Sequence, residues 1–456
     1  MQRGPRSSRR EFLKLATATT VAASSRIRFL DAQEATPAAP GERVGLATIG
    51  IGGQGTSDTK AALKTPGVEL VAVADLYDGR LARAKETFGD KVATTREYKE
   101  ILARPDVDAV IIGTSDHWHV PITVAALAAG KHVYCEKPMV QHWEEGHQVI
   151  DAQKKSGKVV QVGSQRVSSV VYLKARDLLA SGAIGELNMI DAWWSRNSPI
   201  GAWQYSIPPD ASPATVDWER YLDGRAPRRP FDPLRFFRWR NYQDYGTGVA
   251  GDLFVHLFSG VHVITGSLGP TRVMSTGGLR FWKDGRDVPD VMLGLFDYPK
   301  TDRHPAFNLT LRVNFAEGGG DNSGLRFVGS EGVMTVSNEV SLTKQARPAE
   351  PGFTIDTFPK ATQEQFMKEY RSQYPDATAQ LLPLQVETYR TPRDYNDTEH
   401  HFRNFFASIR SKAPMVEDAV FGLRAAGPAV VCNLSYFEGR QYAWDPDAMK
   451  ATPSRG

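Results

Sequence analysis

A glycine-rich turn between an apolar strand and a helix is the feature that most constrains how this chain can fold. The run "GIGGQG", residues 50–55, follows the apolar segment "VGLATI" and precedes a helical pattern, and Asp75 closes the next apolar run. In a G-x-G-x-x-G turn the first glycine permits the tight bend, the second lets the backbone approach a pyrophosphate, and the third allows close helix packing. The helix N-terminus then offers amides to the phosphates. The sequence therefore predicts a dinucleotide site here.

The acidic residue after the second strand predicts which dinucleotide binds. A carboxylate at the position of Asp75 hydrogen-bonds the adenosine ribose and repels a 2′-phosphate, so we expect NAD to be preferred over NADP. Arg80 weakens that preference, and binding of NADP stays open. The residues predicted at this part of the site are Gly50, Ile51, Gly52, Gly53, Gln54, Gly55, Asp75 and Arg80.

Short apolar strands alternate with helical patterns from Val44 onward, which is typical of a parallel sheet covered on both faces. From about Tyr172 the strands become longer, alternating and more aromatic, as in "LNMIDAWWS" and "AFNLTLRVNFA". We predict an α/β protein: an N-terminal Rossmann parallel sheet over residues 41–170, then a C-terminal α+β domain over residues 171–456 with a large, mainly antiparallel open sheet. Two helical patterns near the C-terminus are expected to pack on one of the two sheets.

The first 40 residues predict an export signal and a linker. The stretch "SRREFLK", Ser8 to Lys14, resembles the twin-arginine signal, an address that is read by export machinery and is not part of the fold. The run "LATATTVAASS" after it is too short and too polar for a stable membrane helix. We therefore expect a periplasmic or otherwise exported protein that folds before transport, with the twin-arginine machinery as a partner and no stable membrane insertion.

Charge and cysteine content exclude several classes of function. The formal net charge is +3, but residues 1–40 hold seven Lys and Arg against three acids, so the remainder is near −1. This removes the electrostatic argument for nucleic acid or an anionic membrane as a partner. Cys135 and Cys432 are the only cysteines, too few for a disulfide framework, and Cys135 sits in an apolar strand pattern typical of a buried residue.

Three further motifs carry a resemblance to a known family. The runs "TSDHWH", "CEKP" and "GDLFVH", with the glycine-rich turn, resemble the Gfo/Idh/MocA family of sugar and polyol oxidoreductases over nearly the whole chain after the linker. The resemblance implies that Glu136-Lys137-Pro138 lies beside the nicotinamide and that the loop from Thr114 to His119 lies near the cofactor. Ser115 replaces the proline usual in that loop. The further predicted cofactor contacts are Thr114, Ser115, His119, Glu136, Lys137 and Gln165.

The segment "GDLFVHLFSGVHVITG" reads as a helix with Asp252 and His256 one turn apart. Oxidation of an alcohol needs a base for the hydroxyl proton, and an imidazole suits that role. A carboxylate one turn away is expected to orient the ring, and Lys137 to stabilise negative charge on the reacting oxygen. The resemblance agrees and implies that His256 is the general base. Many relatives carry an acid three residues later, where this chain has Ser259.

Other polar and aromatic residues are candidates for metal or sugar binding. Asp116, His117 and His119 lie too close in sequence and lack a distant ligand, so we predict no metal site. Residues 199–245 are rich in aromatics and arginines, which suit either sugar stacking or a loop clamped onto a sheet. The residues predicted to contact substrate are Arg166, Trp203 and Arg238.

Three functions remain open at this point. The first is an exported NAD(P)-dependent oxidoreductase acting on a secondary hydroxyl of a sugar, polyol or glycoside, with a tightly bound cofactor. The second is a redox-neutral hydrolase or lyase that passes through a keto-sugar, and the third is a sugar-binding protein without catalysis. The open second sheet also predicts a homo-oligomer paired face to face.

Overall fold

The computed structural model describes residues 24–29, 43–344, 354–373 and 384–454, and its N-terminal domain is built on a six-stranded, all-parallel sheet. The strand order is β4-β3-β2-β5-β6-β7. The strands are β2 (Val44–Ile49), β3 (Val68–Ala74), β4 (Ala93–Thr95), β5 (Ala109–Ile112), β6 (His132–Cys135) and β7 (Val160–Val162). The helices of this domain are α2 (Gly53–Ala62), α3 (Asp78–Phe88), α4 (Tyr98–Ala103), α5 (His119–Ala128) and α6 (Gly146–Ser156).

The parallel arrangement follows from strands that are apolar on both faces. Every residue of β2 and of β5 is buried, so helices must cover the sheet on both sides. The order of strands reverses direction between β2 and β5, and ligands of such sheets bind at the carboxyl ends of the strands flanking that point. The predicted parallel Rossmann sheet is confirmed.

The second domain is one mixed sheet of eleven strands, in the order β1-β15-β14-β13-β12-β8-β11-β10-β9-β16-β17. Only the β8–β11 and β1–β15 pairs are parallel. Its strands are β1 (Ser24–Phe29), β8 (Leu187–Ser195), β9 (Arg272–Gly278), β10 (Val291–Tyr298), β11 (Phe307–Asn314), β12 (Asn322–Gly329), β13 (Gly332–Val336), β14 (Glu339–Lys344), β15 (Gln385–Arg390), β16 (Tyr442–Asp445) and β17 (Lys450–Pro453). The predicted mainly antiparallel sheet is confirmed.

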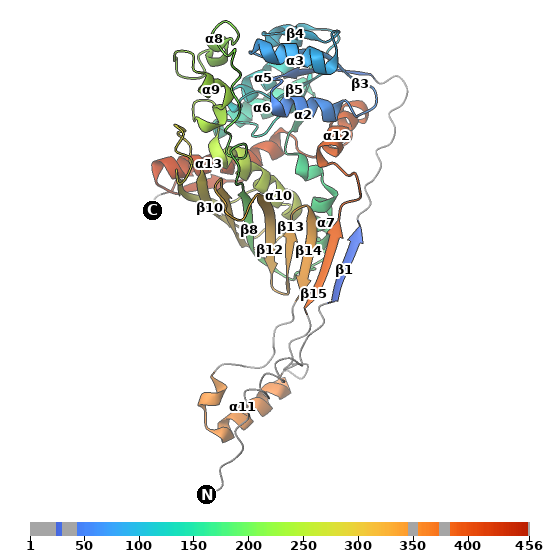
Figure 1. Ribbon diagram of the computed structural model, residues 1–456. Helices are drawn as coiled ribbons and strands as arrows, with labels where there is room; N and C mark the ends of the chain where they lie inside the picture. Colours follow the sequence, from blue (N-terminus) through green and yellow to red (C-terminus); the bar gives the residue numbers. More distant parts are fainter. Residues whose placement is uncertain (1–23, 30–42, 345–353, 374–383, 455–456) are drawn as a thin grey trace, which may run out of the picture.

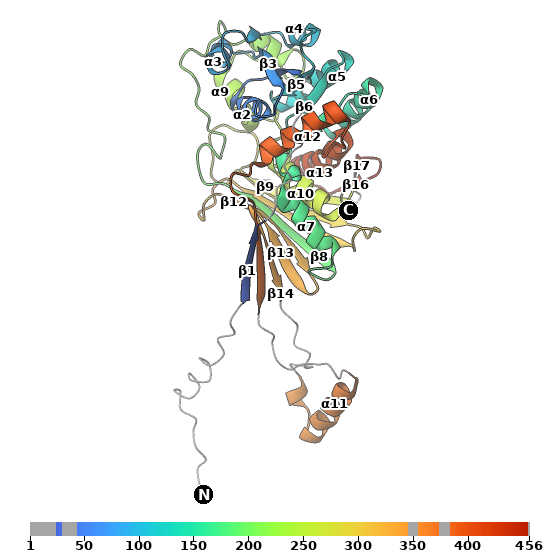
Figure 2. The ribbon, with the colours of Figure 1, turned by 90° about the vertical axis from the view of Figure 1, so that its right-hand side faces the viewer.

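One face of this large sheet is covered by helices and the other is open (Figures 1 and 2). Strand β11 alternates buried and more exposed residues, as expected for a sheet with one face against a core. The covering helices are α7 (Val170–Ala180), α10 (Val255–Thr265), which continues a π-helical turn at Ala250–Phe254, and α13 (Ala419–Glu438). The remaining helices are α8 (Trp218–Leu222), α9 (Pro233–Phe237), α11 (Lys360–Gln373) and α12 (Asp397–Ser411).

Helix α12 completes the core of the first domain, although it lies more than 200 residues beyond it in sequence. Phe402, Phe405 and Phe406 are fully buried there with Leu46 of β2. The ring of Phe402 stacks on Tyr134 at a centroid distance of 4.2 Å. The domains are therefore not two consecutive segments, because a helix of the predicted C-terminal domain belongs to the core of the N-terminal one.

The structure adds a strand within the predicted leader and linker. Residues 24–29 form β1, which pairs in parallel with β15 at the edge of the large sheet. The twin-arginine stretch and the Ala/Pro linker lie outside the described residues. No helix in the described part of the chain has the length and apolarity that crossing a bilayer requires.

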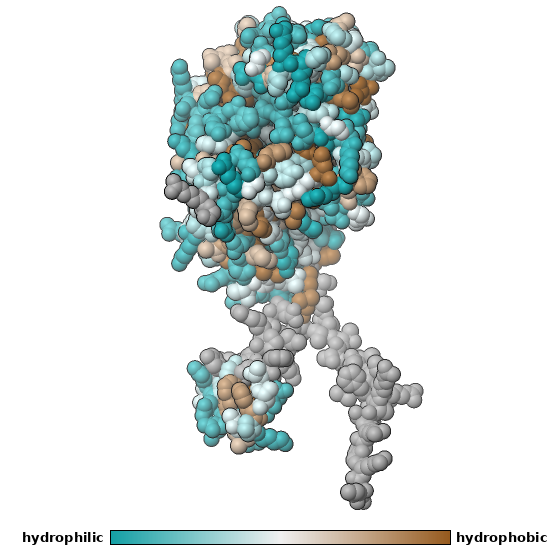
Figure 3. Space-filling model, turned by 90° about the vertical axis from the view of Figure 1, so that its left-hand side faces the viewer, coloured by the Kyte–Doolittle hydropathy of each residue, from teal (hydrophilic) through white to brown (hydrophobic). Residues whose placement is uncertain are grey.

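Helix α11 belongs to an excursion between β14 and β15 that projects beyond the end of the sheet (Figure 1). Figure 3 shows it as a separate body with hydrophobic side chains at its surface. Phe358 and Phe366 are exposed, and Phe366 stacks on Tyr370. This excursion is remote from the strand ends where the dinucleotide site is expected.

Candidate active site between the two domains

The glycine-rich turn has the geometry that its sequence predicts. Gly50 has φ +86°, a left-handed conformation that favours glycine, and a Cβ there would lie 2.7 Å from the backbone of Gly113. A Cβ on Gly55 would lie 2.1 Å from the carbonyl oxygen of Gly50. At Gly53 such an atom would meet nothing within 4 Å. The turn therefore needs its outer glycines for packing and leaves its middle open for a ligand.

A cavity of about 140 Å³ lies at the carboxyl ends of β2, β3 and β5, where the predicted dinucleotide site was expected. Its walls come from both domains. The first domain contributes Gly50, Gly52, Gly53, Gln54, Asp75, Arg80, Thr114 and Ser115, and the second contributes Tyr205, Arg220, Tyr221, Phe236, Phe237, Trp239 and Arg240.

Asp75 is held in place by the backbone of the glycine-rich turn. Its carboxylate accepts hydrogen bonds from the amides of Ile51, at 2.9 Å, and Tyr77, at 3.0 Å. Arg80 lies 3.5 Å from the same carboxylate, and its guanidinium lies over the rings of Phe236 and Phe237. The structure thus fixes Asp75 at the wall of the cavity, with Arg80 beside it as the sequence suggested.

Residues 199–245, which we call the aromatic cap, are clamped onto the first domain. Tyr77 forms an isolated antiparallel bridge with Val216, and its hydroxyl donates to Asp210 at 2.6 Å. The edge of the Tyr77 ring packs against Phe237 at a centroid distance of 5.2 Å. Tyr77, Val216 and Phe237 belong to one buried hydrophobic cluster. Of the two interpretations of this aromatic segment, the structure favours the clamp, and the clamp closes over the dinucleotide cavity.

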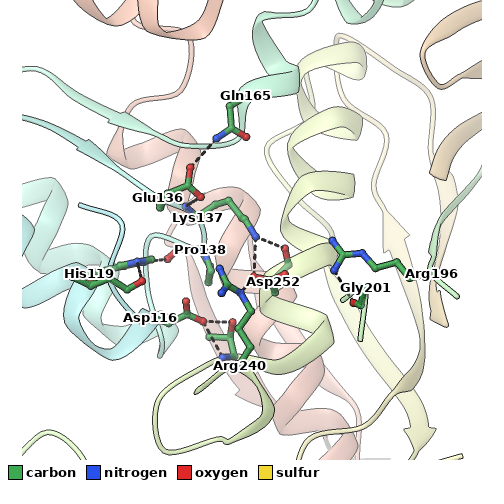
Figure 4. A network of polar contacts seen from close by, with 12 residues as sticks. Asp116, His119, Glu136, Lys137, Pro138, Gln165, Arg196, Gly201, Arg240 and Asp252 are labelled. Carbon is green, nitrogen blue, oxygen red and sulfur yellow. Dashed lines mark hydrogen bonds and ion pairs between the residues drawn. The ribbon is translucent and has the colours of Figure 1, made fainter. Parts of the chain in front are cut away.

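The loop after β5 carries buried, neutral histidines. Burial lowers the pKa of His117 and of His119 to about 4. The His119 ring hydrogen-bonds the carbonyls of Pro138, at 2.7 Å, and Thr114, at 3.3 Å. His119 therefore does not line the cavity as predicted but ties two cofactor-proximal loops together (Figure 4). No cluster of three metal-ligating side chains occurs within the described residues.

Glu136 and Gln165, both predicted cofactor contacts, bind each other behind Lys137. The Gln165 amide donates to Glu136 at 2.7 Å, and the Lys137 backbone amide donates to the other carboxylate oxygen at 3.3 Å. Burial raises the pKa of Glu136 to about 7, even though the charge of Lys137 opposes the rise. The structure therefore places Glu136 as a support under Lys137.

Lys137, at the end of β6, reaches across to the second domain. Its ammonium donates to the Asp252 carboxylate at 2.8 Å and to the Asp252 carbonyl at 2.9 Å (Figure 4). Arg240 of the aromatic cap donates to the same carboxylate oxygen at 3.0 Å. Burial would raise the pKa of Asp252, but Lys137 and Arg240 together hold it well below its usual range. Asp252 is therefore an anion shared by two cations from different segments.

The expected pairing of Asp252 with His256 does not form. Asp252 lies in the π-helical turn, whose wider winding changes the stacking of residues one turn apart, and its Oδ1 accepts hydrogen bonds from Lys137 and Arg240. His256 instead packs on Trp194, with ring centroids 5.1 Å apart. Burial, with the nearby charge of Lys137, holds the pKa of His256 well below its ordinary value. The imidazole is therefore neutral and able to accept a proton.

Ser259, which stands where many relatives carry an acid, is buried and hydrogen-bonds neither Lys137 nor Asp252. Its hydroxyl hydrogen-bonds Ser164 and Glu417, each at 3.3 Å, in a buried cluster. Burial raises the pKa of Glu417 well above its ordinary value. This chain therefore lacks an acid at position 259, but Glu417, from a distant segment, places a carboxyl group beside Ser259 in the core between the domains.

Two of the three predicted substrate residues lie elsewhere. The Trp203 prediction is wrong: the side chain is only 1% exposed and packs edge-on against Phe315 in the core. Arg238 binds the carbonyl of Tyr205 and the side chain of Gln204, so it holds the loop of the cap. Arg166 does lie at the site, with its guanidinium 5.7 Å from the centre of the Trp194 ring.

Three residues of the site were not singled out from the sequence: Trp194, Arg196 and Arg240. Arg240 is one of seven arginines in residues 199–245, and nothing in their spacing separates it from the others. Trp194 and Arg196 lie at the end of β8. The sequence shows that both residues lie at the end of an alternating aromatic strand, but it does not show that this strand ends beside His256.

Fold and site together define a two-domain dinucleotide-binding protein in which both domains meet over the cofactor cavity. Residues 44–164 match the model of the Gfo/Idh/MocA family, described as an oxidoreductase family with an NAD-binding Rossmann fold. The first domain of this chain is therefore similar to the NAD-binding Rossmann domains of that family.

Comparisons with individual proteins agree with this assignment. The chain is 35% identical over 144 residues to inositol 2-dehydrogenase of Salmonella typhimurium, which covers 31% of this chain and 43% of that protein. It is 32% identical over 161 residues to inositol 2-dehydrogenase of Rubrobacter xylanophilus, covering 35% and 46%. The matched segments thus span less than half the length of these relatives.

Solved structures share the fold over nearly the whole chain. A levoglucosan dehydrogenase in complex with NADH and levoglucosan has a TM-score of 0.63 at 17% identity, covering 88% of this chain and 99% of that one. The WlbA dehydrogenase of Bordetella pertussis in complex with NADH and UDP-GlcNAcA has a TM-score of 0.63 at 15% identity, covering 89% and 99%. These likenesses establish a common two-domain architecture.

Proposed function

We propose that this protein is an NAD(P)-dependent oxidoreductase that acts on a secondary hydroxyl of a sugar, polyol or glycoside. The observation that carries the proposal is the Lys137–Asp252 ion pair, which joins the two domains beside the neutral imidazole of His256. Arg240 binds this pair and also lines the dinucleotide cavity. The acid-base groups and the cofactor site therefore adjoin each other. The named relatives, inositol 2-dehydrogenases among them, support this class of reaction.

The residues present fit a bound NAD. Gly50 and Gly55 let the turn pack closely against neighbouring backbone, and the open space at Gly53 leaves room for a ligand. Residues 50–55 with the N-terminus of α2 would hold the pyrophosphate, and Asp75 the adenosine ribose. Bound there, the nicotinamide supplies the hydride acceptor. Because Asp75 is held at the cavity wall, we expect NAD to be preferred.

The chain's own residues supply the proton chemistry. We assign His256 as the base that takes the proton of the substrate hydroxyl, since its imidazole is neutral. The Lys137 ammonium stabilises the negative charge that develops on the same oxygen. Asp252 and Arg240 hold that ammonium in position, so Asp252 acts through Lys137 and does not orient His256. An intact set of these groups argues against a sugar-binding protein without catalysis.

The aromatic cap supports a further proposal, that the cofactor is retained between turnovers. The cap forms one wall of the cavity and is fixed to the first domain by buried aromatic contacts. Export by the twin-arginine route, proposed from Ser8–Lys14, would place the protein where no soluble nicotinamide pool is expected. A retained cofactor must then be regenerated by a second substrate, or by a redox-neutral cycle that cleaves its substrate through a keto-sugar.

We also propose a homo-oligomer formed through the open face of the large sheet. Met274 and Leu295 are cross-strand neighbours on β9 and β10 and are 40% and 49% exposed. Leu293 lies on the same face and is also exposed. Apolar side chains grouped on an open sheet are typical of a surface that another subunit covers.

Analysis of the purified protein for released nucleotide, followed by a screen of sugars and polyols, tests the proposed function. The screen should be read both for NADH formation and for cleavage products. We expect His256→Ala to lower turnover by roughly 100-fold while leaving NAD affinity nearly unchanged, as loss of a general base does. His142→Ala, at an exposed histidine, is the matched control. Wild-type turnover in the His256 variant would overturn its assignment as the base.

A further inference from the structure

Two arginines flank the tryptophan on which the proposed catalytic histidine packs. The guanidinium of Arg166 lies 5.7 Å from the centre of the Trp194 ring, and that of Arg196 lies 5.9 Å from it. Trp194 in turn packs on His256 at a centroid distance of 5.1 Å. Figure 4 shows Arg196 reaching toward the helix that carries Asp252. Two cations from different domains therefore converge beside the acid-base groups.

Neither arginine forms an ion pair within the described part of the chain, although both are half-buried. Arg166 donates to the Asn338 amide oxygen at 3.1 Å and contacts the Tyr172 hydroxyl. Asp397 lies within electrostatic reach of Arg166 but is not bound to it. Arg196 donates to the carbonyl of Gly201 at 2.9 Å and lies over the Phe315 ring. Each guanidinium thus keeps donors free for a ligand.

Cations outnumber anions around the site. Lys137, Arg166, Arg196 and Arg240 act on Asp252 or His256. The facing carboxyls are the anion of Asp252 and the buried groups of Glu136 and Asp116, whose pKa values burial raises to about 7. Asp252 is already shared by Lys137 and Arg240. A neutral sugar would leave the two remaining guanidiniums without an ion-pair partner. An anion would be attracted to them and would neutralise the excess charge.

We propose that the substrate is a sugar or polyol acid, whose carboxylate is bound by Arg166 and Arg196 while a ring hydroxyl faces Lys137 and His256. This inference rests on the proposed function, because it assigns the substrate class of that same site. The planar fork of a guanidinium matches a carboxylate with two parallel hydrogen bonds. The half-buried Trp194 ring, which lies close to both arginines, provides an apolar surface for the sugar ring.

The test compares matched acidic and neutral sugars on the NADH-loaded protein. Binding of glucuronate and glucose, and of galacturonate and galactose, is measured by calorimetry, with glucose 6-phosphate as a separate probe. We expect each acid to bind at least tenfold more tightly than its neutral partner. Arg166→Gln and Arg196→Gln should each weaken acid binding by roughly 10- to 100-fold, since each removes a charged hydrogen bond. Binding of the neutral sugars should change little.

A matched control lies on the opposite face of the large sheet, on the neighbouring strand β11. Arg312 lies over Trp193 at 5.9 Å, as Arg196 lies over Trp194, but it is exposed on the open face. Arg312→Gln should leave acid binding unchanged. Arg166→Lys and Arg196→Lys keep the positive charge but lose the planar guanidinium group. These variants should retain part of the preference for acidic over neutral sugars, and their melting temperature should equal that of the unaltered protein.

The outcomes separate this inference from the proposed function. Equal binding of acidic and neutral sugars, or a preference that survives both glutamine substitutions, overturns the inference even if the enzyme oxidises neutral sugars. A stronger preference for the sugar phosphate overturns the assignment of a carboxylate. Arginine-dependent acid binding supports the inference even if no NADH is formed from any substrate, a result that would overturn the proposed function alone.

Discussion

The Lys137 ammonium lies 2.8 Å from the Asp252 carboxylate and joins the end of strand β6 to the helix at the centre of the second domain. Both groups are buried, and Arg240 binds the same carboxylate oxygen at 3.0 Å. Removing one member of a buried ion pair leaves its partner with an uncompensated charge. Stability, domain orientation and the position of the ammonium therefore depend on one carboxylate.

Asp252→Asn keeps the shape of the side chain and removes its charge, leaving Lys137 and Arg240 without their shared counterion. We expect the free energy of unfolding to fall by about 3–5 kcal/mol. Turnover should fall by roughly 100-fold, because Lys137 loses the group that positions it. Chemical denaturation and steady-state kinetics measure the two effects. Asp297→Asn, at an exposed ion pair with Arg272, is the control and should cost at most about 1 kcal/mol.

Asp75→Ala tests the predicted choice of cofactor. The variant removes a carboxylate that is positioned to bind the ribose hydroxyls, so the affinity for NAD should fall. The ratio of the affinity for NAD to the affinity for NADP should therefore decrease. Arg80→Ala removes the cation beside it and should weaken NADP more than NAD. Calorimetry with both cofactors measures these differences. Equal affinity of the unaltered protein for NAD and NADP would contradict the role given to Asp75.

The fold was predictable because its signals are local and repeated. Uninterrupted apolar strands such as "VGLATI" predict a parallel sheet, and the glycine-rich turn fixes which strand ends meet the cofactor. Lys137 was predictable for the same reason, since it directly follows a strand of that sheet. These predictions need only the period of the pattern and the rule that ligands bind at the carboxyl ends of parallel strands.

The remainder of the site depends on tertiary contacts that sequence spacing does not encode. Asp252 and His256 have the spacing of one helical turn, yet they do not pair. Asp252 lies in a π-helical turn and binds two cations that are distant in sequence, Lys137 and Arg240. Trp203 and Trp194 are both tryptophans in aromatic stretches of the sequence, and only the folded chain shows that the first is core and the second lies at the site. Helix α12 completes a core whose strands are far earlier in the chain.

Asp116 provides a test of buried charge through the pH dependence of stability. Burial raises the pKa of its carboxyl to about 7, whereas the unfolded chain releases that proton near its ordinary value of 3.8. The unfolded state therefore binds fewer protons between these two values, and this group lowers stability as pH rises through that window, by about 1.4 kcal/mol per unit.

Asp116→Asn removes this titration while its side-chain oxygen can still accept the two hydrogen bonds from Thr247. The melting temperature of the variant relative to the unaltered protein should therefore increase from pH 4 to pH 7 and then level off. Calorimetric scans across that range on the nucleotide-free protein measure it. A difference independent of pH would show that Asp116 stays ionised in the folded protein.

Leu295→Asp tests the proposed subunit interface. It places a charge on the exposed apolar face beside Met274 without disturbing the buried face of β10. If another subunit covers this face, the variant should sediment as a smaller species than the unaltered protein. Asp191, on the open face of β8, is already paired with Arg326, so Asp191→Asn is a control that should keep the oligomer. An unaltered protein that sediments as a monomer would contradict the proposal.

Phe237→Ala tests whether the aromatic cap retains the cofactor. Phe237 is 6% exposed, lines the cavity, packs on Tyr77 and lies under the Arg80 guanidinium. Its removal opens the cavity wall and loosens the contact between cap and first domain. We expect the unaltered protein to keep NAD(H) through gel filtration and to turn over without added nucleotide, and the variant to release the nucleotide at least tenfold faster.

Mass spectrometry of the nucleotide that remains bound after filtration measures this retention. Phe281→Ala, at a residue that is 63% exposed, is the control and should retain as much as the unaltered protein. Phe237→Leu separates loss of the wall from loss of stability, because leucine keeps an apolar contact with Tyr77. If the unaltered protein emerges without nucleotide and forms NADH in proportion to added NAD, the cap is a structural clamp alone. The enzyme would then draw its cofactor from a soluble pool, and the proposed cycle with retained cofactor would be wrong.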